Sequence, residues 1–386
     1  MDSNLRASSV LTLRTACLLL LISINSSIFL QSFDSQFSAH AQPYLASRYP
    51  TLTAELNATE IAVIARLIEV KPTLGGPADD EFLARFEVVQ VLKGDKIEPK
   101  LVIEEPFFGE EKPGSLFLLS GWRRKTVFWR DPVPISARSQ AYLGKLLALP
   151  KAGVERLAFF LDYLNDSETF VVCDAHNEFT KVDYKTLTTL KSRLNHDQIL
   201  EWLQDSKAPH SRRRLLFLLL SICGNEKDIP LLEQRIREQT PALDACITCY
   251  IQLRGAEALE FVDELCLKPK DARYETSLNA IASLRFHASS SAVVPRQRLL
   301  DSLRLVLDRP KLAHSVIPDL AKMKDWDSMD RLMDLYRKAD EKSLWIRTPV
   351  VEYLQSCPLP RAKVLLDECR TIDAAAVRRA EEKPSR

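Results

Sequence analysis

Two nearby cysteines are the residues whose types and spacing most directly suggest chemistry. Cys246 and Cys249 form a CxxC pattern, which binds zinc when further ligands complete a set of four, or exchanges disulfides when it begins a helix. The sequence supplies no such ligands nearby, and Leu243, Cys246, Ile247 and Tyr250 have the spacing of one apolar helix stripe. We therefore expect both thiols to pack in the core, with a redox or metal role as the alternative.

A cluster of two carboxylates and one histidine is the second candidate. Asp174, His176 and Glu178 could bind a metal ion or transfer protons. On a helix, however, residues two positions apart point in different directions, so the three side chains do not converge. Asp174 and Glu178 share one face, and we expect them to meet Lys or Arg of an adjacent repeat. The sequence accordingly predicts no metal ion.

Three consecutive arginines open the strongly apolar segment 215–223. A guanidinium group matches a carboxylate or a phosphate in shape and charge, so Arg212 and Arg213 are candidate contacts to a partner. The alternative is structural: one of the three arginines bridges to an aspartate of the preceding helix pair, and the other two are solvated.

Aromatic and cationic residues also gather on a predicted hairpin. Trp122, Arg123 and Arg124 precede its turn and Trp129 follows it. Small β-barrels bind extended polymers on surfaces of this kind, so these four residues are a candidate site for an envelope polysaccharide or a partner protein. The alternative is that the two tryptophans pack beneath a connecting helix and hold two domains together.

The sequence patterns of common enzymes are missing. The chain contains no GxSxG, HExxH or GxGxxG pattern, and its histidines are scattered singly. We therefore predict no catalytic residue and no cofactor.

Residues 1–41 resemble an export signal. Arg6 and Arg14 precede an apolar run at 16–30, and Ala39-His40-Ala41 has the small-x-small pattern of a cleavage site. The run is shorter than the roughly 20 apolar residues that span a membrane. Cleavage would give a periplasmic or extracellular protein, whereas retention of the apolar run would leave the protein anchored in the membrane.

Residues 54–134 predict an antiparallel β domain. Short apolar runs that alternate or end at turn residues predict at least five strands, at 61–70, 82–92, 101–103, 116–119 and 127–129. Six of the ten glycines lie between Gly75 and Gly121, where turns between short strands require them. These features favour a small barrel or sandwich.

This region resembles the netrin-like, OB-type β-barrels of exported proteins. The resemblance rests on Ala-Arg-Phe-Glu-Val-Val-Gln-Val-Leu-Lys-Gly at 84–94 and on Lys-Pro-Gly-Ser-Leu-Phe-Leu-Leu at 112–119. The tissue-inhibitor branch of that family would imply protease inhibition, which depends on a cysteine at the mature N-terminus. This chain has Gln42 there and no cysteine at 42–172, so the inhibitory chemistry is not carried over.

The remaining sequence predicts pairs of helices. A linker helix at 135–152 leads into the segment 153–379, where a short amphipathic helix is repeatedly followed by a more apolar one. Helix pairs at a period of about 30 to 40 residues bury their faces only by stacking on their neighbours as a solenoid. This pattern resembles HEAT-type repeats, whose second helix often carries a small residue where helices approach closely. The second helices are centred near Ala175, Leu215, Ala245, Ala280, Val316 and Val350.

The expected fold class is α+β multidomain: a small antiparallel β-barrel or sandwich followed by an all-α HEAT-like solenoid. The 53 Lys and Arg and the 52 Asp and Glu are interspersed and give a net charge of +1, so no basic stripe marks a nucleic-acid surface. The whole arrangement resembles a group of exported bacterial proteins. We expect a non-enzymatic scaffold or adaptor that binds a protein or an envelope polymer. The alternatives are a HEAT-type, lyase-like enzyme acting on a protein substrate, or a membrane-anchored structural protein of the envelope.

Overall fold

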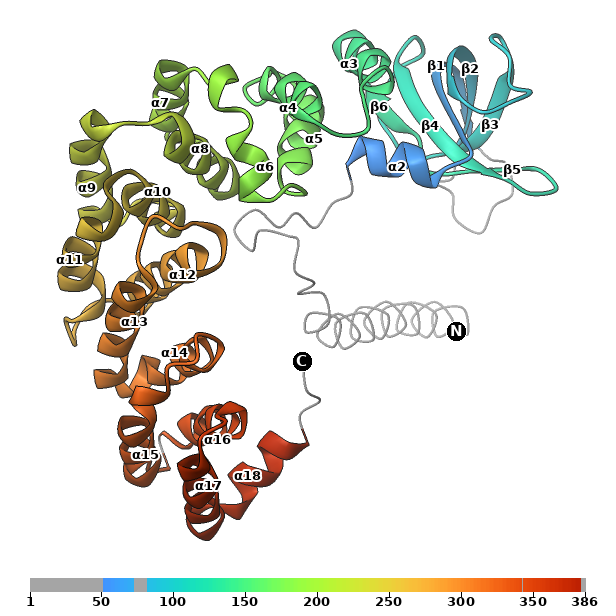
Figure 1. Ribbon diagram of the computed structural model, residues 1–386. Coiled ribbons are helices and arrows are strands. Elements are labelled where there is room, and N and C mark those ends of the chain that lie inside the picture. The colour runs from blue at the N-terminus through green and yellow to red at the C-terminus, as the bar shows by residue number, and fades with distance from the viewer. Residues whose placement is uncertain (1–50, 73–81, 342, 383–386) are drawn as a thin grey trace, which may run out of the picture.

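The computed structural model describes residues 51–72, 82–341 and 343–382. Within them, an antiparallel sheet gives way to helices that follow one another along an arc (Figure 1). The class is α+β, as predicted. The predicted export signal 1–41 and the glycine turn at 75–77 lie outside the described residues.

Six strands form one antiparallel sheet. In chain order they are β1 (Ile61–Pro72), β2 (Phe82–Lys93), β3 (Val102–Phe107), β4 (Leu116–Arg123), β5 (Val127–Trp129) and β6 (Val133–Ile135). Their order in space is β3-β2-β1-β4-β5, and β6 also pairs with β4. The predicted barrel is wrong, because the sheet stays open: among the described strands, neither β5 nor β6 pairs with β3.

Both faces of β1 are buried. Ala62 and Ile64 face a core shared with helices, whereas Val63 and Ala65 face a second core within the sheet module. Three register shifts between β1 and β2 bend the sheet around this second core. The continuous apolar run 61–65 is typical of a strand that is buried on both sides. The run therefore indicated that β1 is covered on both sides, although it does not report whether the sheet closes.

A helix that the sequence pattern did not predict precedes the sheet. α2 (Leu52–Ala58) begins after Thr51, whose side chain accepts a hydrogen bond of 3.2 Å from the Ala54 N–H. Leu52 and Leu56 are buried one turn apart and pack in the core shared by the sheet and the helices. We expected strand-like structure from residue 54 onward. A threonine ahead of two leucines four residues apart is the helix signal that was missed.

Three helices connect the sheet to the array. α3 (Ala137–Leu147) lies within the predicted linker range 135–152 and buries Tyr142 in the shared core. It is followed by α4 (Val154–Leu161) and α5 (Thr169–Phe179). The core is continuous across this junction, so the sheet and the first helices pack as one body.

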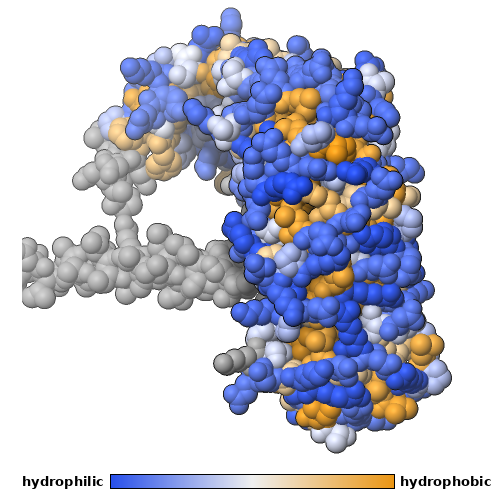
Figure 2. All heavy atoms as spheres, turned by 90° about the vertical axis from the view of Figure 1, so that its left-hand side faces the viewer, coloured by the Kyte–Doolittle hydropathy of each residue, from blue (hydrophilic) through white to orange (hydrophobic). Residues whose placement is uncertain are grey.

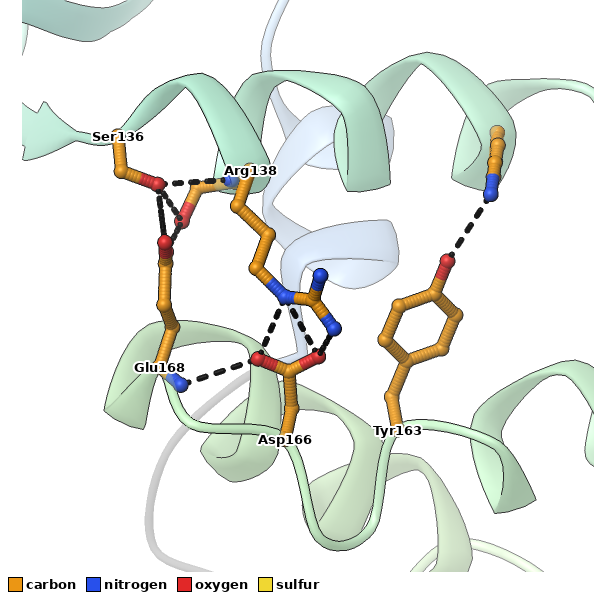
Figure 3. A network of polar contacts seen from close by, with 7 residues as sticks. Ser136, Arg138, Tyr163, Asp166 and Glu168 are labelled. Atoms are coloured by element: carbon orange, nitrogen blue, oxygen red, sulfur yellow. Dashed lines mark hydrogen bonds and ion pairs between the residues drawn. The ribbon is translucent and has the colours of Figure 1, made fainter.

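Polar contacts fix α3 against the loop between α4 and α5 (Figure 3). Arg138 donates from Nε to both carboxylate oxygens of Asp166, at 2.9 and 2.8 Å. Ser136 and Ser139 each donate a hydrogen bond of 2.6 Å to Glu168. The Asp166 side chain is only 1% exposed, so its carboxylate is shielded from solvent. Together the contacts set the direction in which the array leaves the sheet.

From α5 onward, the helices form two rows (Figure 1). The inner row, on the concave side, consists of α5, α8 (His210–Cys223), α10 (Leu243–Arg254), α12 (Tyr274–Ser290), α14 (Pro310–Lys322) and α16 (Arg347–Ser356). The outer row consists of α7 (His196–Gln204), α9 (Ile229–Arg237), α11 (Ala258–Val262), α13 (Arg296–Leu305) and α15 (Met329–Lys338). The short α6 (Tyr184–Thr188) lies between α5 and α7 in the chain, and α17 (Pro360–Ile372) and α18 (Ala374–Glu381) end the array.

Each predicted second-helix centre lies in the inner row. The six residues are fully buried: Ala175, Leu215, Ala245, Ala280, Val316 and Val350. Along the row, α10 contacts both α8 and α12, and α14 contacts both α12 and α16. Within the inner row, α10 and α14 therefore each pack against a helix on both sides.

The outward side of the array is mainly hydrophilic, with hydrophobic residues in smaller groups between the blue rows (Figure 2). Among the described residues, no helix combines the length and the apolar character needed to cross a membrane.

Candidate functional site

A groove of about 730 Å³ lies among α8, α10, α12, α13 and α14. Arg214 of α8 and Asp244 of α10 line one end, and Asp319 and Lys322 of α14 line another part. The wall between them comes from the second half of α12 and from the loop that leads into α13. This volume lies within the range of about 300–1,000 Å³ that ligand sites occupy.

A smaller hollow of about 260 Å³ continues the groove. The two share the Arg214 and Asp244 side chains, so they adjoin at this pair. The loop that borders the smaller hollow holds Gln239 and Ala242 with φ of 52° and 65°. Left-handed backbone at non-glycine residues is uncommon and tends to occur at functional sites. We call the two hollows together the inner groove.

Close packing between α10 and α12 sets the position of the groove wall. The Thr248 and Ser283 hydroxyls lie 3.0 Å apart, and Ser283 Oγ donates a hydrogen bond of 2.6 Å to the Asp244 carbonyl. Both hydroxyl residues are fully buried. Small side chains let the two helices approach closely, and the hydroxyls satisfy the buried polar groups there. The spacing of α10 and α12 is thereby fixed.

Arginine–aspartate pairs join successive inner helices along the groove. Arg214 of α8 lies 3.1 Å from Asp244 of α10, and Arg285 of α12 donates from Nε to Asp319 of α14 at 2.9 Å. The partners are 30 and 34 residues apart in sequence, close to the helix-pair period. Asp244 is 4% exposed, so its pairing with Arg214 satisfies a carboxylate that is almost out of water.

His287 contributes a neutral ring to the groove wall. Its Nε2 donates a hydrogen bond of 3.2 Å to the Thr248 carbonyl, because a carbonyl can only accept. Burial lowers the pKa of His287 to about 4, and the bond to Thr248 only partly opposes this. The ring therefore carries no charge at neutral pH, and the charge of the groove comes from its Arg, Lys and Asp side chains.

The three arginines of α8 are all engaged within the protein. Arg212 donates to the Asn165 side chain, and Arg213, 7% exposed, donates to the Ala208 and Asp205 carbonyls at 3.1 and 2.8 Å. The expected bridge to a preceding aspartate is wrong, because Arg214 pairs with Asp244 of the following helix pair. Asp244 lies in the first turn of α10, where the helix dipole favours a carboxylate.

The hairpin residues lie on the sheet, away from α8 (Figure 1). Trp122 Nε1 donates a hydrogen bond of 2.8 Å to the Ala58 carbonyl at the end of α2, and Arg123 donates to the Asp95 carbonyl at 2.5 Å. Trp129 is 9% exposed and packs in the second core of the sheet, whereas Arg124 is exposed. The tryptophans therefore do not pack beneath the linker helix: Trp122 contacts α2, and Trp129 packs within the sheet module.

Cys246 and Cys249 are fully buried in α10. Burial raises the pKa of both thiols well above the ordinary value, which disfavours the thiolate that metal binding and disulfide exchange need. Within the residues that the structure describes, no group of three or more His, Cys, Asp or Glu side chains is placed to hold a metal ion.

Asp174 and Glu178 share one face of α5 but have different partners. Glu178 pairs with Arg156 at 3.0 Å, but Arg156 lies on α4, the helix before α5 in the same pair, rather than in an adjacent repeat as predicted. Asp174 does not pair with Lys or Arg: it accepts hydrogen bonds of 2.7 Å from the Tyr142 hydroxyl and from the Leu52 N–H. The N-terminus of α2 takes the place of a cation there, because its free N–H groups attract a carboxylate. Burial raises the pKa of Asp174 to about 6 despite these bonds.

Sequence reasoning missed the inner groove itself. Arg285, Arg296 and Lys322 carry much of its charge, and none of them stood out in the sequence. The usable signal was the repeated Arg-to-Asp spacing from one second helix to the next, seen at Arg214 and Arg285. The candidates that did stand out lie elsewhere: the hairpin on the sheet, and Arg212 and Arg213 beside the groove.

No known family model matches the chain, and no curated protein matches it either. The site is therefore interpreted from its own geometry and chemistry.

Proposed function

We propose that the chain is an exported, non-enzymatic adaptor whose HEAT-like helical array binds a protein partner along the inner row. The observation that carries this proposal is the inner groove, which extends from α8 to α14 and contacts several helix pairs at once. Stacked helix pairs commonly present such extended concave surfaces for binding. The Gln42 start predicted by the signal pattern would place the mature protein outside the cytoplasm.

The charge arrangement supports binding over catalysis. An enzyme in the array would need acidic or other reactive groups that remain available to a substrate. In the groove, Asp244 and Asp319 are each engaged by an arginine of the neighbouring inner helix. Paired carboxylates of this kind orient helices and are poorly suited to accept or donate protons. The lyase-like alternative therefore gains no support from these residues.

Site-specific photo-crosslinking of the full chain in a bacterial host tests this function. A photoreactive amino acid is placed at Ser289 or Ser290, which are exposed and line the groove, or at Lys338 on the outer row as the control. We expect a discrete protein adduct from the two groove positions and none from Lys338. The absence of adducts at both groove positions, or equal adducts at Lys338, would contradict the adaptor role.

Intact mass of the native protein tests export separately. A chain that begins at Gln42 would support cleavage of the predicted signal. A chain that retains 16–30 would reject cleavage and favour the membrane-anchored alternative.

A further inference from the structure

We propose that the inner groove binds an extended acidic segment of the partner, in which carboxylate residues alternate with apolar ones. This inference rests on the proposed adaptor function, because it names the chemical class of the partner for the same surface. Three features carry it: the shape of the groove, its excess of cations, and its apolar wall.

The shape favours a chain over a compact ligand. The two hollows meet at the Arg214–Asp244 pair, so the groove continues from the first turns of α8 and α10 to the end of α14. An extended peptide advances about 3.3 Å per residue and would contact several inner helices in turn. A small compact ligand would fill only one of the two hollows.

The charges favour a negatively charged occupant. Five cationic side chains and three carboxylates line the inner groove: Arg214, Arg273, Arg285, Arg296, Lys322, Asp244, Asp319 and Glu275. Each of the carboxylates lies within 4.0 Å of an arginine. The three carboxylates are matched by Arg214, Arg273 and Arg285, which leaves the exposed Arg296 and Lys322 as the two lining cations in excess. The charge of Arg296 also helps to lower the pKa of Asp325, which does not line the groove. Complementary carboxylates on a partner would be attracted to the two excess cations.

The start of α13 adds to this attraction. Its N-cap is Pro295, which offers no side chain to bind the first free N–H groups of the helix. Arg296 is the first residue of α13, so a cationic side chain and the positive end of the helix dipole lie together at the groove. α13 has ten residues.

The wall of the groove is apolar between these charges. Val294, Leu299 and Leu303 line it together with Phe286 and Met323. A purely anionic polymer would leave this surface without contacts, whereas leucine or valine side chains between carboxylates would bury against it. The wall is therefore the reason to propose a peptide with alternating acidic and apolar residues.

Fluorescence anisotropy with the full-length protein tests the inference. The probe is a short labelled peptide in which Glu and Leu alternate, separated by Ser for solubility. One comparison peptide carries Lys in place of Glu, and another carries Ser in place of Leu. We expect only the Glu/Leu peptide to bind tightly, with an affinity that falls as salt is added.

A matched pair of double variants locates the binding. Arg296→Glu with Lys322→Glu reverses the two excess charges of the groove, and we expect it to weaken peptide binding at least about tenfold. Lys338→Glu with Lys363→Glu makes the same charge change at exposed positions outside the groove lining and is expected to leave binding unchanged. Circular dichroism of both variants verifies that the fold is retained.

Several outcomes would overturn the inference. These are binding of the Lys/Leu or Glu/Ser peptide as tight as that of the Glu/Leu peptide, equal affinity of the two double variants, or binding of labelled dextran sulfate with no binding of the Glu/Leu peptide. If crosslinks from Ser289 persist while the Glu/Leu peptide fails to bind, the adaptor role stands and the acidic-segment proposal falls. If no crosslink forms from the groove, the adaptor role itself fails.

Discussion

The Tyr142 hydroxyl lies 2.7 Å from Oδ2 of Asp174, inside the core that the sheet and the helical array share. Tyr142 belongs to α3 and Asp174 to α5, and the other oxygen of Asp174 accepts the Leu52 N–H of α2. One carboxylate therefore joins three helices at the point where the two halves of the molecule meet.

Removal of the tyrosine hydroxyl is expected to weaken this junction. Tyr142→Phe leaves one oxygen of a buried carboxylate without its donor, which costs about 1–3 kcal/mol in the free energy of unfolding. Urea unfolding followed by circular dichroism measures the loss. Tyr163→Phe is the control, because the Tyr163 hydroxyl lies 3.4 Å from Lys145 in an exposed contact (Figure 3), and its loss should cost about 0.5 kcal/mol or less. Equal losses in the two variants would contradict the role given to Asp174.

The junction should also depend on pH. Burial raises the pKa of Asp174 to about 6 in the folded protein, whereas an unfolded aspartate titrates near about 3.9. Between these values the folded state holds a proton that the unfolded state releases, so the contribution of Asp174 to stability falls as pH rises through this window and is lowest above it. Relative to Asp174→Asn, the wild type should lose up to about 3 kcal/mol between pH 4 and pH 7.

The comparison with the variant is the measurement that isolates Asp174. Urea unfolding of both proteins at several pH values gives a difference from which the other titrating groups largely cancel. A difference that stays constant with pH would show that the carboxylate does not titrate in this range.

The register of α17 can be tested with one buried and one exposed position. Ala362 is 1% exposed and Val364 is 68% exposed on the same helix. Ala362→Glu would bury a charge and is expected to destabilise the protein by about 3 kcal/mol or more. Val364→Glu introduces the same charge into solvent, with an effect within about 0.5 kcal/mol. Melting curves compare the loss of stability in the two variants. A larger loss for Val364→Glu than for Ala362→Glu would require a different helix register.

The two arginine–aspartate pairs of the inner row should differ in their effect on stability. The Asp244 side chain is 5% exposed and that of Asp319 is 16% exposed. Arg214→Met leaves the more deeply buried carboxylate unpaired and is expected to cost about 3 kcal/mol. Arg285→Met acts on a pair whose arginine is 46% exposed, so we expect about 1 kcal/mol. Urea midpoints give both values, and a larger loss for Arg285→Met would contradict this ranking.

Secondary structure in the array could be predicted well because its signals are local. The inner-row centres, from Ala175 to Val350, were marked by apolar spacing and small residues, and all of them are buried. Strands β1 to β5 were marked by alternation and by turn residues. The α2 helix was missed because seven residues hold too few turns for the period of a helix to stand out.

What could not be predicted depends on contacts between distant residues. Closure of the sheet depends on whether its end strands meet, and no local pattern reports that. The groove likewise requires Arg214 and Lys322, more than a hundred residues apart in sequence, to line one hollow. Conspicuous local clusters such as Trp122 to Arg124 attracted a functional interpretation, whereas the structure shows Trp122 and Arg123 bonded to main-chain carbonyls.

The shared core around Ile64, Tyr142 and Ala175 also constrains how such a chain can change during evolution. Inner helices in the middle of the array, such as α10 and α14, pack against a helix of the same row on both sides, so we expect duplication or deletion of a pair there to keep most of these contacts. The joint from α2 to α5 has no such interchangeable neighbour. We therefore expect the array to vary in length more readily downstream, while the first helices and the sheet are inherited together.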